Sequence, residues 1–203
     1  HNKRRNMSEQ SIGQPVCPIS TTSNDDRVLL AHGEGGRMMR DLLRRHILPA
    51  VQNELPNSTG DAARLAPIDG PLCMTADSFV VSPLFFPGGD IGSLSVYGTV
   101  NDLAVSGALP MYLTLSLILE EGLPIDVLDR VLGSISTAAQ ETHVAIIAGD
   151  TKVVPRGAAD GLFINTTGIG RLIEPAPPGP ERLRAGDEII VTGAVGRHGI
   201  AVL

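Results

Sequence analysis

Residues 144–154, "VAIIAGDTKVV", place an acid, a hydroxyl and a base at one point of an otherwise apolar segment. The run Val144 to Ala148 predicts a buried strand, and a glycine follows it. Asp150, Thr151 and Lys152 come next, before the chain turns apolar again. Two interpretations are open at this point. The stretch is either a turn in which the acid and the base form a surface ion pair, or a site for a metal ion and a phosphate.

The segments on both sides of this stretch show alternating helix and strand patterns. Apolar residues recur with helical spacing between 125 and 135, with Pro124 in the first turn. Residues 111–124 and 161–173 predict strands, and 87–110 a helix of small residues that ends at Gly107 and Pro110. Residues 72–86 predict one strand, or two strands interrupted at Asp77. Because the order lacks βαβ regularity, we expect an α+β domain with a mixed sheet and flanking helices.

The N-terminal part predicts a leader and a helix. Apolar positions 38, 39, 42, 43 and 47 have helical spacing, and Pro49 lies where such a helix should end. A surface connection follows. We expect a disordered leader or tag (1–27), an N-terminal domain (28–172), a Pro-rich linker (173–186) and the strand–turn–helix start of a second domain, cut off at Leu203 (187–203).

Composition narrows the class of protein. The 203 residues are 42% hydrophobic with a net charge of -6, and no basic stripe is evident, so nothing favours nucleic acid as a partner. Cys17 and Cys73 match no metal spacing, and a reducing compartment is favoured over a disulfide. No apolar run reaches the roughly 20 residues that span a bilayer, and no signal peptide is recognisable. We therefore expect a cytoplasmic protein without membrane contact.

Polar residues recur at the ends of apolar runs or inside them. Each one alone has an ordinary interpretation as a cap, a turn or a paired surface charge. Several like charges near one another are costly unless a cation offsets them, and carboxylates without His or Cys suit Mg²⁺. The residues are Asp77, Asn101, Asp102, Glu120, Glu121, Asp150 and Lys152.

Two glycine-rich segments could approach an anion. "HGEGG" (32–36) precedes a helix, so its backbone N–H groups and the helix N-terminus could face a phosphate. It matches neither a Walker loop nor a dinucleotide fingerprint. His32 on its own is better read as a hydrogen-bonded structural residue than as a catalyst. "FPGGDIG" (86–92) is equally ambiguous as an isolated loop.

Taken in order, five motifs resemble one family. "HGEGG", "TADSFVVSPLFFPGGDIG", "YGTVNDLAVSGALP", "ILEEGLP" and "GDTKVVPRG" are similar to the HypE hydrogenase maturation factors. That family belongs to the ATP-binding superfamily of aminoimidazole ribonucleotide synthetase, selenophosphate synthetase and thiamine-monophosphate kinase. The resemblance runs from about Leu29 to the chain end. One departure is Arg197, which stands where the family usually has an acid.

The resemblance implies a fold and an activity. The fold is like the N-terminal domain of aminoimidazole ribonucleotide synthetase, which forms a β-barrel-like dimer with nucleotide bound near the interface. The activity is ATP-dependent dehydration of a carbamoyl group on a C-terminal cysteine to a thiocyanate, which supplies the cyanide ligand of [NiFe]-hydrogenase. The implied partners are HypF, for carbamoyl transfer, and HypC–HypD, the cyanide acceptor.

The resemblance also implies roles for individual residues. ATP and Mg²⁺ are the implied cofactors, and Lys152 is the implied catalytic residue, acting on developing phosphoryl charge. The implied metal ligands are Asp77, Asp102 and Asp150. The implied nucleotide-binding residues are these three with Gly33, Gly35, Gly36, Asn101 and Thr151.

Two alternatives remain. The first is another enzyme of the superfamily, such as selenophosphate synthetase, with Cys17 as its reactive residue. The second is a non-catalytic module that dimerises and binds partners. Dimerisation itself is predicted from the alternating run "YLTLSLIL" (112–119), which would expose one apolar face if it were unpaired.

Overall fold

The centre of the molecule is a four-stranded sheet with the strand order β1-β6-β4-β5. The computed structural model describes residues 26–51, 62–175, 177 and 179–202. The strands are β1 (Leu72–Phe79), β6 (Leu162–Leu172), β4 (Ala108–Glu120) and β5 (Ala145–Val154). β6 is antiparallel to both β1 and β4, whereas β4 and β5 are parallel. The prediction of a mixed sheet is confirmed.

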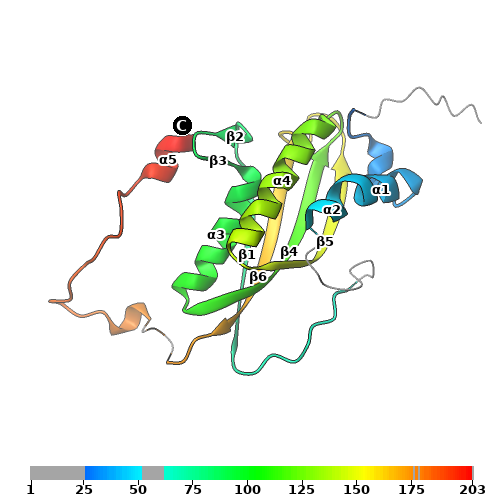
Figure 1. Cartoon of the computed structure of the whole chain (residues 1–203). Helices are drawn as coiled ribbons and strands as arrows, with labels where there is room; N and C mark the ends of the chain where they lie inside the picture. Colours follow the sequence, from blue (N-terminus) through cyan, green and yellow to red (C-terminus); the bar gives the residue numbers. More distant parts are fainter. Residues whose placement is uncertain (1–25, 52–61, 176, 178, 203) are drawn as a thin grey trace, which may run out of the picture.

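Helices α3 (Ile91–Val105) and α4 (Ile125–Glu141) lie together on one face of this sheet (Figure 1). We call this the helix-covered face and the opposite one the open face. Alternate residues of β4, from Leu113 to Leu119, are buried under the helices with the apolar side of α4. The apolar face of "YLTLSLIL" is therefore covered within the chain, so the argument that predicted a dimer from it was wrong.

Local signals explain the ends of α3. Asp90 is its N-cap, and the Asp90 carboxylate accepts hydrogen bonds from the backbone N–H groups of Gly92 and Ser93. Gly107 follows the helix with φ 78, a left-handed conformation that glycine adopts without strain. The predicted stop at Gly107 is confirmed, whereas Pro110 lies inside β4.

The N-terminal helix continues past its predicted end. After a 3₁₀ turn (Leu30–Gly33), α1 (Arg37–Leu42) passes through a π-helical turn (Leu43–Ile47) into α2 (Leu48–Val51). The Leu48 N–H donates to Leu43 O, five residues back. The stop predicted at Pro49 was wrong, because Pro49 occupies the first turn of α2, where the missing N–H costs little.

Two further predictions differ from the structure, and a third falls partly outside the described residues. β1 runs unbroken through Asp77, and the chain then makes a small hairpin of β2 (Phe85–Phe86) and β3 (Gly89–Asp90). Residues 1–25 of the predicted leader lie outside the described residues, but Arg27 forms a β-bridge to Pro124, so the ordered domain begins before residue 28. The predicted connection after the N-terminal helix is described only from residue 62 onward.

The C-terminal segment lies apart from the sheet (Figure 1). It contains a 3₁₀ turn (Pro180–Arg182) and the short helix α5 (Arg197–Val202). The strand expected before that helix does not form. Ile189 and Ile190 are 92% and 85% exposed, since no described strand lies beside them to pair with.

Within one chain the sheet is open rather than closed into a barrel. Large apolar side chains are exposed along β1 and β4 on its open face, among them Leu72, Met74 and Ile118. No helix among the described residues is long and apolar enough to cross a bilayer.

Candidate active site

The two faces of the sheet divide the predicted site residues into two groups. Residues paired across neighbouring strands share a face. Asp77 pairs with Thr166, whose buried side chain lies under α3, so Asp77 is on the helix-covered face. Asp150 pairs with Ser116 on β4, on the open face and at the other edge of the sheet.

The first group gathers where α3 crosses β1. The Thr75 hydroxyl donates to Asp102 Oδ2 at 3.2 Å. Thr75 and Asp77 are two residues apart on β1 and therefore face α3 together. A Cβ on Gly98 would lie 2.8 Å from the Phe79 ring and 3.9 Å from Asp77 Oδ2, so a glycine is needed for this close approach. The structure thus brings Asp77 and Asp102 to one region.

Asn101 adjoins this group. It is exposed on α3, next to Asp102 in the sequence, and no hydrogen bond of its side chain to a described residue is present. Its amide is available to a ligand. Thr75 and Gly98 were not singled out from the sequence, although the Thr-x-Asp spacing on a strand is a signal that could have identified Thr75.

The second group lies on β5. Lys152 Nζ is 3.6 Å from Asp150 Oδ2, and both side chains are mostly exposed. The Thr151 backbone N–H donates to Asp150 Oδ1 at 2.9 Å. The acid and the base share one face, as their spacing predicts. The ion pair also fits the alternative interpretation of a surface pair, which by itself contributes about 0–1 kcal/mol.

The Thr151 side chain does not join Asp150. It is 5% exposed and lies with Leu117 on the helix-covered face, because successive residues of a strand point to opposite faces. A role for its side chain beside Asp150 is therefore excluded.

The glycine-rich loop packs against the end of β5. A Cβ on Gly33 would lie 3.0 Å from both Cβ and N of Val153, so the loop depends on a glycine to come this close. Gly35 has φ 73, and Gly36 is the N-cap of α1. His32 Nδ1 accepts from the Leu29 N–H at 2.9 Å, which supports the structural interpretation of this histidine. The loop thus neighbours the strand segment that carries Lys152.

The Glu120 carboxylate accepts hydrogen bonds from two backbone N–H groups. It accepts from the N–H of Gly157 at 2.5 Å and of Gly161 at 2.8 Å, which ties the loop between β5 and β6 to the end of β4. These two backbone hydrogen bonds lower the pKa of Glu120 below its ordinary value of 4.5. No described residue donates a hydrogen bond to the Glu121 carboxylate.

The part of the chain that the structure describes contains no group of three His, Cys, Asp or Glu side chains placed to hold a metal ion. Asp77, Asp102 and Asp150 therefore do not form one ion site within a single chain, since Asp150 is on the other face and three strands away. Two carboxylates do suit Mg²⁺, which usually takes one or two carboxylates with substrate phosphates. Asp77 and Asp102 offer two carboxylates in one region.

Comparison with known proteins yields one family and a consistent set of relatives. The model of the family "AIR synthase related protein, N-terminal domain" matches residues 59–172. Carbamoyl dehydratase HypE of Rhizobium leguminosarum bv. viciae is 46% identical over 177 residues, which are 87% of this chain and 51% of the relative. Carbamoyl dehydratase HypE of Escherichia coli K12 is 44% identical over 183 residues, 88% of this chain and 54% of the relative.

Solved structures agree with these matches. A hydrogenase maturation protein HypE in complex with ATP is 51% identical with a TM-score of 0.81, over 86% of this chain and 52% of that one. A HypE–HypF complex contains a chain that is 47% identical with a TM-score of 0.52, over 70% of this chain and 44% of that one. The chain spans about half the length of the curated relatives that it matches.

Proposed function

This chain belongs to the family of AIR synthase related proteins, and we propose that within the family it is the ATP-binding part of a HypE-type carbamoyl dehydratase. The observation that carries the proposal is the match to an ATP-bound HypE at 51% identity and a TM-score of 0.81 over 86% of the chain. The relatives named carbamoyl dehydratase support the same activity.

The proposed reaction consumes ATP to dehydrate a thiocarbamate. The carbamoyl oxygen of a cysteine S-carboxamide attacks the γ-phosphorus, and ADP leaves. The C–O bond to the new phosphate then breaks while nitrogen loses its protons, which leaves a thiocyanate and inorganic phosphate. Cys73 is no candidate for the carrier, because it lies within β1 on the helix-covered face. Cys17 lies outside the described residues.

We propose that the open faces of two copies pair in a two-fold dimer that completes the barrel. The support is the exposed apolar surface of Leu72, Met74 and Ile118 on a sheet face without covering helices. Burying this surface against a second copy removes it from water, and a two-fold contact applies the same patch twice.

The dimer gives each group of site residues a role. Asp77 and Asp102 of one copy hold Mg²⁺ together with the phosphates of ATP, with Asn101 beside them. Asp150 and Lys152 come from the second copy, at the rim of the interface where its edge strand β5 meets the edge strand β1 of the first copy, and the Lys152 ammonium stabilises charge on the phosphates. Gly33, Gly35 and Gly36 offer backbone N–H groups close to Lys152. Mg²⁺ supplies charge neutralisation at the phosphates when it is bound.

A mixing experiment tests this arrangement. Asp102→Asn and Lys152→Ala chains are each expected to bind Mg·ATP weakly as homodimers. After unfolding and refolding as an equal mixture, half of the dimers contain both variants, and each of these has one site with all its native residues. Calorimetry should then recover about one quarter of the wild-type sites. If Asp102 and Lys152 acted within one chain, mixing would recover none.

Further measurements test the proposed dehydration reaction separately from the proposed dimer. In protein extended to the length of the HypE relatives, Lys152→Ala should lower thiocyanate formation by about 10²-fold while the dimer persists. Normal turnover by this variant would contradict the catalytic role of Lys152. Mg·ATP binding by the wild type without any thiocyanate formation would favour the non-catalytic module, and selenophosphate formation would favour the other enzyme.

The proposed macromolecular partners follow the relatives. The solved HypE–HypF complex supports HypF as a partner. We propose that HypF is the source of the carbamoyl group. HypC–HypD is proposed as the cyanide acceptor. A pull-down with purified HypF and with HypC–HypD tests each contact directly, and no binding to HypF would count against the carbamoyl-transfer step.

A further inference from the structure

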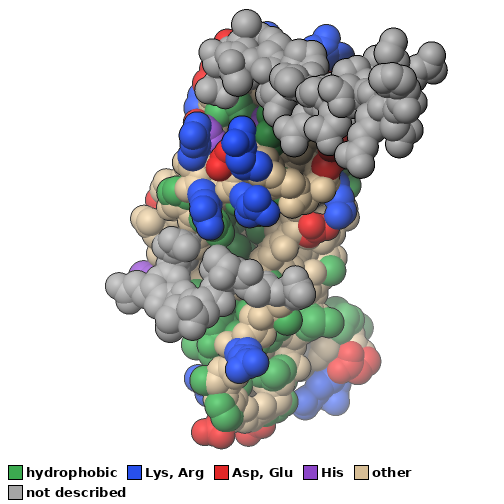
Figure 2. Space-filling view, turned by 90° about the vertical axis from the view of Figure 1, so that its right-hand side faces the viewer, with side chains coloured by type: hydrophobic (Ala, Val, Ile, Leu, Met, Phe, Trp, Pro, Cys, Tyr) green, Lys and Arg blue, Asp and Glu red, His purple; other side chains and the backbone are tan. Residues whose placement is uncertain are grey.

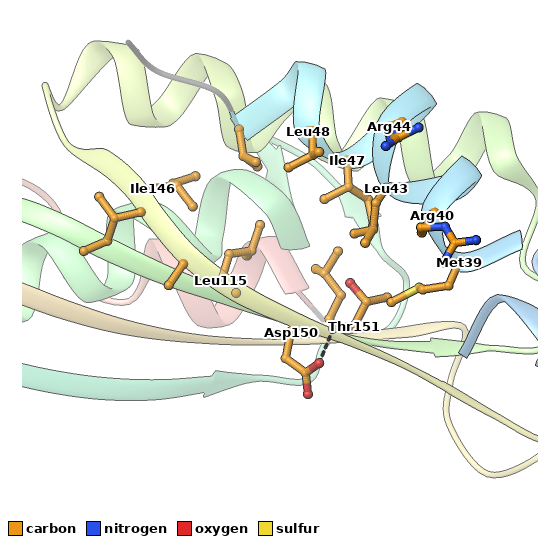
Figure 3. A pocket seen from close by; sticks show the side chains of 15 residues that line it. Met39, Arg40, Leu43, Arg44, Ile47, Leu48, Leu115, Ile146, Asp150 and Thr151 are labelled. Atoms are coloured by element: carbon orange, nitrogen blue, oxygen red, sulfur yellow. Dashed lines mark hydrogen bonds between the residues drawn. The ribbon is translucent and has the colours of Figure 1, made fainter. Parts of the chain in front are cut away.

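We propose that a cavity between the N-terminal helix and β5 binds an organic carboxylate with an apolar body, at a site separate from the nucleotide. The cavity has a volume of about 450 Å³, within the range of small-molecule pockets. It lies on the helix-covered side of β5. Asp150 contributes to the lining, but its side chain points away from the helix wall (Figure 3) and, like Lys152, projects from the open side. The inference does not depend on the proposed function.

The walls of the cavity are apolar. Folded interiors leave few voids of this size, so an open apolar space under a helix is a binding feature rather than a packing defect. Gly149 adds no side chain to the sheet wall, and the π-helical turn sets the course of the helix wall. The apolar lining comes from Leu43, Ile47, Leu48, Leu115, Leu117 and Ile146.

One hydroxyl faces this apolar space. The Thr151 side chain is 5% exposed and lines the cavity, and Figure 3 shows it on the side of the strand that faces the helix. No described residue forms a hydrogen bond with its Oγ1, whereas its backbone N–H donates to Asp150 Oδ1. A nearly buried hydroxyl without a protein partner is available to a polar atom of a ligand.

Two guanidinium groups mark the rim. Arg40 and Arg44 line the cavity, are exposed, and lie one helical turn apart (Figure 3). Neither forms an ion pair with any residue that the structure describes, where the ion pairs are His46–Asp129 and Lys152–Asp150. Arg37 and Arg45 of the same helix are also exposed, and Figure 2 shows basic side chains gathered on this side of the molecule.

These three features select the ligand class. The apolar walls accept a hydrocarbon chain or ring, the rim accepts an anion, and the Thr151 hydroxyl donates to or accepts from a polar atom between them. A carboxylate suits the guanidinium fork better than a neutral head group does. A bare inorganic anion has nothing to place in the cavity, and a neutral hydrocarbon makes no use of the rim.

Octanoate is the probe, and calorimetry on the whole chain is the measurement. Octanoate should bind about tenfold more tightly than octanol, and inorganic phosphate should not compete with it. Arg44→Gln should weaken octanoate by about tenfold and leave octanol unchanged. The matched control is Arg45→Gln, an exposed neighbour that does not line the cavity, which should bind octanoate like the wild type. Thr151→Val keeps the shape of the side chain and removes its hydroxyl. It should therefore bind a probe with a carbonyl or hydroxyl near the middle of its chain more weakly than the wild type does.

Three results would overturn the proposal. The first is no octanoate binding by a wild type that unfolds cooperatively. The second is an equal loss of affinity in Arg44→Gln and Arg45→Gln, which would indicate general charge attraction. The third is displacement of octanoate by Mg·ATP, which would assign the cavity to the nucleotide site. Retention of octanoate in the presence of Mg·ATP supports a separate site, whether or not ATP hydrolysis is observed.

Discussion

Gly92 and Gly133 form a pair of helical glycines with opposite expected responses to alanine. Gly92 lies in the first turn of α3, where the helix touches α4. A Cβ there would be 2.5 Å from the carbonyl oxygen of Val131 and 2.9 Å from Asp90 Oδ1. The Val131 oxygen belongs to the backbone of α4, so it can retreat only if the helix moves. Gly133 lies on α4 itself, and a Cβ on it would meet nothing within 4 Å.

The magnitudes follow from these contacts. Overpacking at Gly92→Ala costs about 1–3 kcal/mol, and displacing the Asp90 carboxylate from its N-cap bonds costs about 1 kcal/mol more. Relief of glycine entropy returns about 0.5–1 kcal/mol, so the net loss is about 1–3.5 kcal/mol. For a chain of this length, 1 kcal/mol shifts the melting temperature by about 2–4 °C, which gives a fall of about 2–14 °C. Gly133→Ala gains only the entropy term, a rise of about 1–4 °C.

Urea unfolding followed by circular dichroism measures both variants under one condition. The urea dependence of the free energy of unfolding should be the same in both variants and the wild type, so that the midpoints report stability alone. If Gly92→Ala matched the wild type, α4 would not lie as close to α3 as the structure has it. A comparable loss in Gly133→Ala would show that alanine harms these helices for another reason.

Three further predictions use single side chains. Because two N–H groups lower the pKa of Glu120, its charge adds stability at neutral pH that is lost as the pH falls through the folded pKa. Glu120→Gln should therefore melt below the wild type at pH 7 and converge with it below pH 4.5. Thr75→Val removes the hydroxyl that donates to Asp102 and should weaken Mg·ATP binding about two- to tenfold in calorimetry, whereas Thr75→Ser should restore the affinity. Equal affinity in the wild type and both variants would contradict the proposed role of Asp102. The Tyr97 hydroxyl donates to Glu141, which raises the pKa of Tyr97 above 10.0. An ultraviolet titration should therefore show one tyrosine that ionises late, and this late step should be absent from Tyr97→Phe. Glu141→Gln should return the pKa of Tyr97 towards the ordinary value.

Much of the fold was predictable because its signals are local. The amphipathic pattern of α4, the glycine after α3 and the alternation in β4 each depend on residues close in sequence, and all three were predicted correctly. Pro49 misled because a proline normally ends a helix, whereas here it falls in the first turn of α2, after a π-helical turn. No local sequence pattern predicts the π-helical turn.

The site was less predictable because it depends on which face of which strand a residue occupies. The period of two within β5 predicted correctly that Asp150 and Lys152 share a face. It could not reveal that β5 and β1 are opposite edges of the sheet, which is a matter of strand order. The same period of two also places Thr151 on the face opposite to Asp150, where its side chain is buried.

The strand order has a consequence for how the chain acquires its structure during synthesis. Among the described strands, β1 pairs only with β6, which is the last strand of this sheet to be made. While the ribosome produces the intervening elements, β1 has no hydrogen-bonding neighbour, and β4 can align with β5 before β6 enters between β4 and β1. Such non-local pairing slows folding and prolongs the time in which unpaired strands can aggregate. A nascent chain arrested before Leu162 should therefore remain sensitive to protease, and release of the full β6 segment should bring protection in a single late step.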